Sequence, residues 1–131
     1  MVDQEEESKP RALVVDDDDS IRTLLQKLVE HLDIKVDTAR DGEEAISMID
    51  EDGYDVILLD LMMPHVDGFE VLTHIREKRP DLLGCTIIAS AVPKQEIFRR
   101  LKDAVYKIHT KPFEIGMLVH DIRACATQAP L

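Results

Sequence analysis

Apolar and polar positions alternate along the chain in blocks that predict a strand followed by a helix, five times over. Residues 13–15, 56–59 and 87–89 are continuously apolar, as is typical of strands covered by helices on both faces. Residues 34–38 and 106–109 instead mix apolar with polar side chains. These two segments are therefore predicted at the edges of a sheet, and the three apolar segments at its centre.

The segments after the strands carry helix signals. Apolar residues recur at helical spacing in the first and last of them, and Asp41 with Glu44 three positions later is typical of a helix start. The five helices are predicted over residues 21–29, from 41 onward, from about 67 to before Pro80, from about 93 to 101, and over 115–122.

The order of elements predicts how the strands are arranged. Alternating strands and helices form parallel sheets through right-handed crossovers. With the second and fifth strands outermost, the strand order becomes 2-1-3-4-5, the order of flavodoxin-like folds. We therefore expect an α/β fold, a doubly wound (βα)5 parallel sheet.

Composition adds limits on class and location. The 131 residues predict one domain over 11–127, between an acidic and disordered tail over 1–10 and a short tail over 128–131. A net charge of −11 argues against direct nucleic-acid binding. Cys85 and Cys125 form no CxxC pair and are expected to be free thiols. With no signal peptide and no apolar run of ~20 residues, we expect no membrane segment and a cytoplasmic location.

Reactive side chains stand at the ends of four predicted strands. Asp16 and Asp17 follow the first strand, Asp60 the third, Ser90 the fourth and Lys111 the fifth. In the predicted strand order these ends meet at one edge of the sheet, where open α/β sheets bind ligands.

The charges at this edge predict a phosphoryl-transfer site. Close carboxylates repel each other by about 4 kcal/mol per pair at an effective dielectric constant near 20. Their hard oxygens suit Mg²⁺, and Lys111 supplies a second positive charge. Together the two cations would let a carboxylate attack a phosphoryl group.

These residues resemble the receiver domain of response regulators in two-component signalling, over roughly residues 11 to 126. The resemblance is carried by Asp16-Asp17, by Asp60 with Pro64 and Asp67-Gly68, by Ser90-Ala91, and by Lys111-Pro112-Phe113. Each motif is weak alone. All of them together, in this order and at these spacings, are highly specific.

The resemblance implies a role for each residue. Asp60 resembles the phosphoacceptor, Lys111 the lysine that pairs with the phosphoryl group, and Ser90 the hydroxyl residue that moves toward it. Asp16, Asp17, Asp60 and the backbone carbonyl of Met62 resemble the Mg²⁺ ligands. The side chains of Met62 and Met63 are interpreted as packing.

The resemblance also implies partners and output. The phosphoryl donor would be a sensor histidine kinase or a phosphotransfer protein. The output would pass through a downstream protein, onward phosphoryl transfer, a phosphorylation-dependent dimer, or an output domain of a longer chain. Beyond transfer onto itself and autodephosphorylation, no enzymatic activity is expected.

One departure concerns the signal readout. Ile108 stands where the family usually has an aromatic residue, three positions before the lysine. We therefore expect that the usual readout through an aromatic side chain is lost. The residues for the phosphorylation chemistry are present, so phosphorylation itself is expected to be intact. A receiver that acts only through protein contacts is one alternative.

A second alternative is a phosphohydrolase of the haloacid-dehalogenase type. Residues 16–20 contain Asp-x-Asp-x-Ser, which resembles its nucleophile motif, with Asp16 as the nucleophile and Asp18 as the acid. Asp60 would then have no role. Asp18 and Asp19 are otherwise expected to begin a helix.

Two further groups of side chains have plainer interpretations. The five histidines lack the spacing of metal ligands and are predicted to be surface residues: His31, His65, His74, His109 and His120. A basic cluster is interpreted as a solvated face, or alternatively as a docking face for an acidic partner: Lys94, Arg99, Arg100, Lys102 and Lys107.

Overall fold

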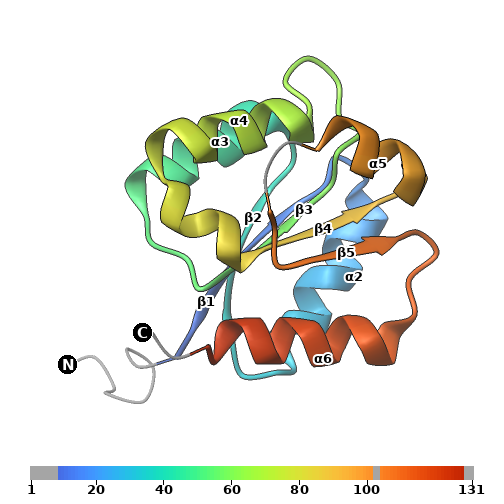
Figure 1. Cartoon of the computed structure of the whole chain (residues 1–131). Helices are drawn as coiled ribbons and strands as arrows, with labels where there is room; N and C mark the ends of the chain where they lie inside the picture. Colours follow the sequence, from blue (N-terminus) through green and yellow to red (C-terminus); the bar gives the residue numbers. More distant parts are fainter. Residues whose placement is uncertain (1–8, 102–103, 129–131) are drawn as a thin grey trace.

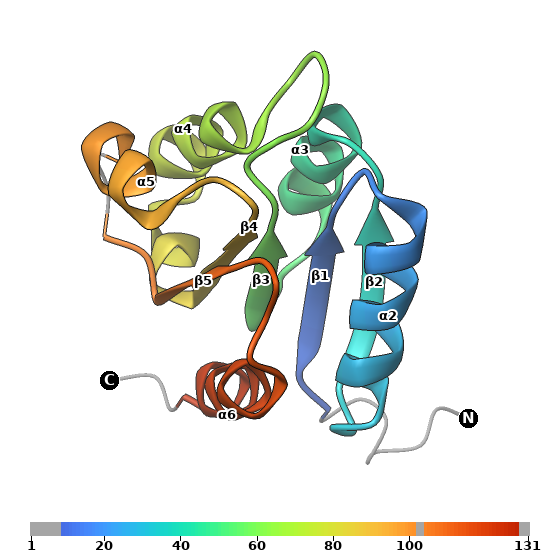
Figure 2. The same ribbon diagram turned by 90° about the vertical axis from the view of Figure 1, so that its right-hand side faces the viewer.

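A parallel five-stranded sheet runs through the middle of the molecule (Figures 1 and 2). The computed structural model describes residues 9–101 and 104–128. Its strands are β1 (Arg11–Val15), β2 (Lys35–Ala39), β3 (Val56–Leu59), β4 (Thr86–Ser90) and β5 (Lys107–Thr110). Their order is β2-β1-β3-β4-β5, so the predicted topology is confirmed.

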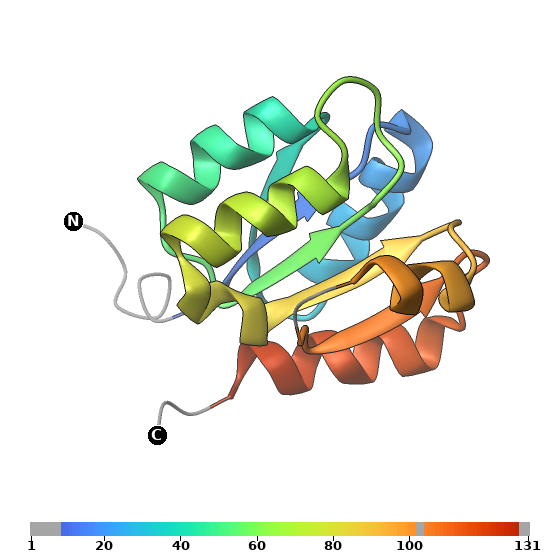
Figure 3. The same cartoon turned by 45° about the horizontal axis from the view of Figure 1, so that its top comes forward.

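Helices cover both faces of the sheet. Those found in the described residues are α2 (Asp19–Glu30), α3 (Gly42–Glu51), α4 (Gly68–Lys78), α5 (Lys94–Arg100) and α6 (Ile115–Ala126). In Figure 1, α3, α4 and α5 lie above the sheet, and α2 and α6 lie below it. Figure 3 shows α3 and α4 side by side over the same face.

The two faces of the sheet bury separate apolar cores because side chains alternate along a strand. On β1, Leu13 and Val15 pack toward α3 and α4, whereas Ala12 and Val14 pack toward α2 and α6. The apolar runs predicted to be central are buried throughout: β3, β4 and all of β1 after Arg11.

Most element boundaries differ from the prediction by one or two residues, and α6 extends four residues beyond the predicted 122. β2 begins at Lys35 because its N–H donates to the carbonyl of Pro10, at 2.9 Å, and extends the ladder from there. α5 ends at Arg100 because Leu101 has extended backbone angles. A short 3-10 helix (η1, Pro80–Cys85) precedes β4 and was not expected.

The predicted tails fall mostly outside the described residues, which begin at Lys9 and end at Gln128. Residues 1–8 of the proposed acidic tail and 129–131 of the C-terminal tail are among those not described. Lys9 itself forms an ion pair with Asp33, with Nζ and Oδ1 3.1 Å apart. No helix in the described part of the chain is long and apolar enough to cross a bilayer.

Helix starts explain several acidic residues. The carboxylate of Asp18 accepts hydrogen bonds from the N–H groups of Ser20 and Ile21, and that of Asp41 accepts from Glu44, as predicted. α5 has fewer stabilising contacts than the other helices. Pro93 precedes it without a side-chain cap, and Ile97 is its one buried residue.

Candidate functional site

Asp60 lies at the carboxyl end of β3, in the middle of the sheet. Its backbone N–H donates to the carbonyl of Val15 at 3.0 Å, which fixes the residue beside the end of β1. The residue is only 3% exposed, and its Oδ1 accepts a hydrogen bond from the N–H of Met62 at 3.3 Å. One carboxylate oxygen is thereby oriented by the loop that follows.

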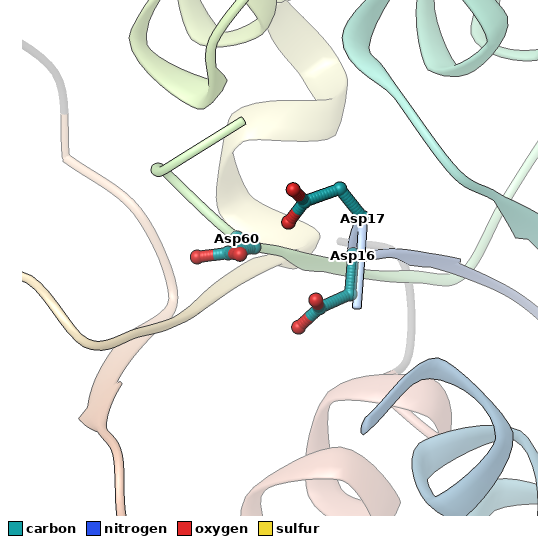
Figure 4. A group of neighbouring side chains, drawn as sticks. All are labelled: Asp16, Asp17 and Asp60. Atoms are coloured by element: carbon teal, nitrogen blue, oxygen red, sulfur yellow. The ribbon is translucent and has the colours of Figure 1, made fainter. Parts of the chain in front are cut away.

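Asp16 and Asp17 bring two further carboxylates to the same place (Figure 4). Asp16 is buried, and its Oδ1 accepts a hydrogen bond from the N–H of Asp18 at 2.9 Å. Asp17 is exposed to solvent. One oxygen from each of Asp16, Asp17 and Asp60 lies within 4.8 Å of the others. The topology therefore assembles the acidic group that the sequence predicted.

Lys111 reaches this acidic group from the end of β5. Its Nζ lies 2.9 Å from Oδ2 of Asp16 and 3.6 Å from Oδ2 of Asp60. Its backbone N–H donates to the carbonyl of Ser90 at 2.8 Å, and the peptide bond to Pro112 is cis. The ammonium group therefore bridges the two buried carboxylates.

Electrostatics at the site follow from burial and crowding. Burial raises the pKa of Asp60 above its ordinary value, and the charge of Asp16 raises it further. Lys111, the Met62 N–H and the Ser90 hydroxyl act in the opposite direction. Burial alone would lower the pKa of Lys111, but its contacts with Asp16 and Asp60 raise it overall. Lys111 is thus held in its charged form.

Ser90 ends β4 with a fully buried side chain beside Asp60. Its Oγ accepts a hydrogen bond from the N–H of Val92 at 3.3 Å. The next residue, Ala91, is exposed and adds little bulk. Ser90 therefore occupies the predicted position at the site.

Two glycines hold the loop between Asp60 and α4 in place. A Cβ on Gly68 would lie 2.3 Å from the carbonyl oxygen of Asp60, and one on Gly42 would lie 2.2 Å from that of Val66. Such distances exclude a side chain at either position. The sequence identifies Gly68 through its motif, whereas Gly42 stands out there only as part of a helix start.

Met62 and Met63 point to different environments. Met63 is 8% exposed and packs into the core, as expected. Met62 is 59% exposed, so its interpretation as packing was wrong. The Met62 N–H, meanwhile, contacts the Asp60 carboxylate.

The acidic group fits a divalent cation of the Mg²⁺ type. Three carboxylates approach one another, and Lys111 alone leaves their charge uncompensated. Hard oxygen donors at a partly open site are what Mg²⁺ uses when it also retains water. Asp17, the exposed member, leaves the solvent side open.

Comparison with known proteins agrees with this geometry. The sequence profile of the response regulator receiver domain matches residues 12–123. The chain belongs to the response regulator receiver domain family. This receiver domain serves phosphorylation-dependent two-component signalling. Its acidic group, formed by Asp16, Asp17 and Asp60, lies within the matched residues.

Several regulators are similar in sequence to this receiver domain. The transcriptional regulatory protein ResD of Bacillus subtilis is 50% identical over 78 residues, which cover 60% of this chain and 32% of ResD. TrcR of Mycobacterium tuberculosis is 34% identical over 116 residues, covering 86% of this chain and 44% of TrcR. The chain therefore spans less than half the length of these relatives.

Solved receiver structures are similar along nearly the whole chain. The receiver domain of the Francisella response regulator 1452 has a TM-score of 0.81 at 32% identity, covering 92% of this chain and 98% of that one. TrrA of Thermotoga maritima, solved in complex with Mg²⁺-BeF, has a TM-score of 0.78 at 32% identity, covering 88% and 98%.

Some features of the receiver domain escaped sequence reasoning. His109 is not a surface residue: its side chain is 10% exposed and its Nε2 lies 2.7 Å from Oδ2 of Asp121. Arg100 lies over the ring of Phe69, 3.8 Å from its centroid. The first contact joins the consecutive elements β5 and α6, and the second joins α5 to α4. Neither follows from the apolar and polar pattern within one element. Lys102, a member of the basic cluster, is outside the described residues.

Proposed function

We propose that Asp60 accepts a phosphoryl group from the phosphohistidine of a sensor histidine kinase or a phosphotransfer protein, with Mg²⁺ bound. One observation carries the proposal: the Lys111 ammonium bridges Asp16 and Asp60 beside an otherwise uncompensated carboxylate group. Lys111 beside one oxygen of the buried Asp60 carboxylate would stabilise the additional negative charge that a phosphoryl group brings.

Asp60 would attack with a carboxylate oxygen while Lys111 pairs with the incoming oxygens. Its Oδ1 is oriented by the Met62 N–H, which leaves Oδ2 beside Lys111. Asp16, Asp17, Asp60 and the backbone carbonyl of Met62 would hold Mg²⁺, which neutralises charge on the phosphoryl oxygens. Ser90, already beside Asp60, would donate its hydroxyl to the phosphoryl group.

Phosphorylation would then change a binding surface. The phosphoryl group can shift a conformational equilibrium only by as much as it interacts better with one state. Ile108 is half-buried on β5 and supplies no ring to report the change. We propose that the output passes to a downstream protein or to a further domain of a longer chain, since ResD and TrcR are transcriptional regulators.

The remaining expectations belong to the same proposal. The domain would act in the cytoplasm, would not bind nucleic acid by itself given its net charge of −11, and would turn over no separate substrate. The phosphohydrolase alternative is disfavoured because Asp18, its required acid, caps α2 with its carboxylate.

Intact mass after incubation with acetyl phosphate and Mg²⁺ tests the proposal. One added phosphoryl group is expected on the wild type, and none on Asp60→Asn or without Mg²⁺. No gain in mass on the wild type, or the same gain on Asp60→Asn, would refute it. Donor hydrolysis that depends on Asp16 but not on Asp60 would favour the phosphohydrolase.

A further inference from the structure

A groove leads away from the phosphoacceptor toward α5. Its lining includes Met62, Val92, Phe69 and Arg100, and its cavity volume is about 360 Å³. The N–H of Met62 contacts Asp60 and the N–H of Val92 contacts Ser90. The groove therefore begins at the residues that flank the proposed phosphoryl site.

Arg100 is a cation without a carboxylate partner in this groove. Its guanidinium carbon lies 3.8 Å from the centroid of the Phe69 ring, and no carboxylate of a described residue forms an ion pair with it. The chain as a whole carries a net charge of −11. The other charged residue of the lining is Asp67, whose carboxylate accepts a hydrogen bond from the N–H of Glu70 and so caps α4.

Arg99, the preceding residue, makes a useful contrast. Its side chain is 76% exposed and lies 3.9 Å from Glu96, and it does not line the groove. Both arginines come from the last turn of α5. Only Arg100 is directed across the groove to α4, so its position there is not a property of the helix end.

We propose that Arg100 determines donor specificity by favouring acyl phosphates, whose leaving group is a carboxylate. The inference rests on the proposed phosphorylation of Asp60. With the phosphoryl group at Asp60, the rest of a small donor extends along the groove between Met62 and Val92. The negative face of the Phe69 ring holds the guanidinium in the groove wall.

The chemical step explains why the leaving group matters. An Asp60 oxygen forms the new bond to phosphorus, the bond between phosphorus and the acyl oxygen breaks, and its electron pair leaves with the carboxylate. Negative charge therefore develops on the departing group, where Arg100 stabilises it. Phosphoramidate instead loses neutral ammonia and gives Arg100 no developing charge to stabilise.

Initial phosphorylation rates with acetyl phosphate and with phosphoramidate, followed by intact mass in saturating Mg²⁺ at fixed ionic strength, test the proposal. Arg100→Gln is expected to lower the rate constant with acetyl phosphate by about fivefold to tenfold, the scale of one ordinary hydrogen bond in a solvent-exposed site. The rate with phosphoramidate should stay unchanged or rise. Arg100→Lys should recover part of the loss, and Arg99→Gln, which removes the same charge, should behave as wild type.

Each outcome separates the two proposals. A wild type that accepts phosphoryl from neither donor refutes the proposed function. A wild type that accepts from both, together with an Arg100→Gln variant that is unchanged or equally slowed with both donors, overturns the role of Arg100 alone. So does an equal loss in Arg99→Gln. The ratio of the two rates within one variant is insensitive to the fraction of protein that is folded.

Discussion

The ammonium group of Lys111 lies 2.9 Å from the carboxylate of Asp16, a residue 95 positions away in the chain. This contact joins the ends of β5 and β1, which are not neighbours in the sheet, across the ends of β3 and β4. Because the same ammonium also approaches Asp60, the site contains one cation against a group of carboxylates. The same crowded carboxylates therefore affect both the stability of the fold and the reactivity of Asp60.

Replacing Asp60 with asparagine should stabilise the fold in the absence of divalent cations. Asp60 has a raised pKa when folded, so the folded state binds its proton more tightly than the unfolded state does. Ionisation of Asp60 therefore lowers stability as the pH rises through the ordinary and then the raised pKa. Asp60→Asn removes this cost, on the order of 1 kcal/mol.

Urea unfolding in EDTA over a pH series measures this effect. The advantage of Asp60→Asn should be full at neutral pH and should shrink as the pH falls and wild-type Asp60 becomes protonated. Adding Mg²⁺ should stabilise the wild type more than the variant. A variant less stable than the wild type at neutral pH would contradict the expectation.

Gly68→Ala should damage both folding and phosphorylation. The added Cβ would lie 2.3 Å from the Asp60 carbonyl oxygen and 2.6 Å from the Leu61 Cα, and neither backbone atom can rotate away. We expect a loss of about 2 kcal/mol or more in the free energy of unfolding. Gly53→Ala is the matched control, since nothing lies within 4 Å of the point that its added methyl group would occupy.

The control should lie within about 0.5 kcal/mol of wild type. Thermal or urea unfolding gives both values, and intact mass gives the phosphorylation rate. If Gly68→Ala and Gly53→Ala proved equally stable, the close approach of α4 to Asp60 would be refuted.

Both thiols should resist alkylation in the folded protein. Burial raises the pKa of Cys85 to about 11 and that of Cys125 to about 12. At pH 8 roughly one Cys85 in a thousand is then a thiolate, the reactive form. Iodoacetamide labelling followed by mass spectrometry should be slow, with half-buried Cys85 labelled before buried Cys125. Rapid labelling of both without denaturant would contradict this expectation.

The pair His109 and Asp121 should contribute more to stability than the similar pair His74 and Asp50. Both pairs have an Nε2 to Oδ distance of 2.7 Å, but the side chains are 10% and 14% exposed in the first and 20% and 48% in the second. Double-mutant cycles with alanine should give a coupling of about 1 kcal/mol for the buried pair and about 0.5 kcal/mol or less for the other. Equal couplings would show that burial does not matter here.

The fold could be predicted because its signals are local and repeated. The continuous apolar run over 56–59 specifies a central strand, and the mixed run over 34–38 specifies an edge. Strand order then follows from crossover handedness. The bounds shifted where a single long-range bond decides them, as when the Pro10 carbonyl accepts from Lys35.

The site could be predicted in its composition but not in all its surroundings. Asp16, Asp60 and Lys111 stand at strand ends, so topology alone brings them together. The exposure of Met62 depends on the backbone path after Asp60, and the position of Arg100 depends on its contact with Phe69 on α4. Neither feature can be predicted from a short stretch of sequence.

The contacts of Gly42 and Gly68 fix the backbone at the two flanks of the loop after Asp60, whereas exposed side chains at its tip can vary. Gly42 abuts the Val66 backbone and Gly68 abuts the Asp60 backbone, so both flanks of the loop are anchored by positions without side chains. Between them, the exposed side chains of Met62 and His65 face solvent. Duplicated copies of such a domain could therefore acquire new recognition surfaces at this tip while inheriting an unchanged acceptor, and an engineer could graft specificity there.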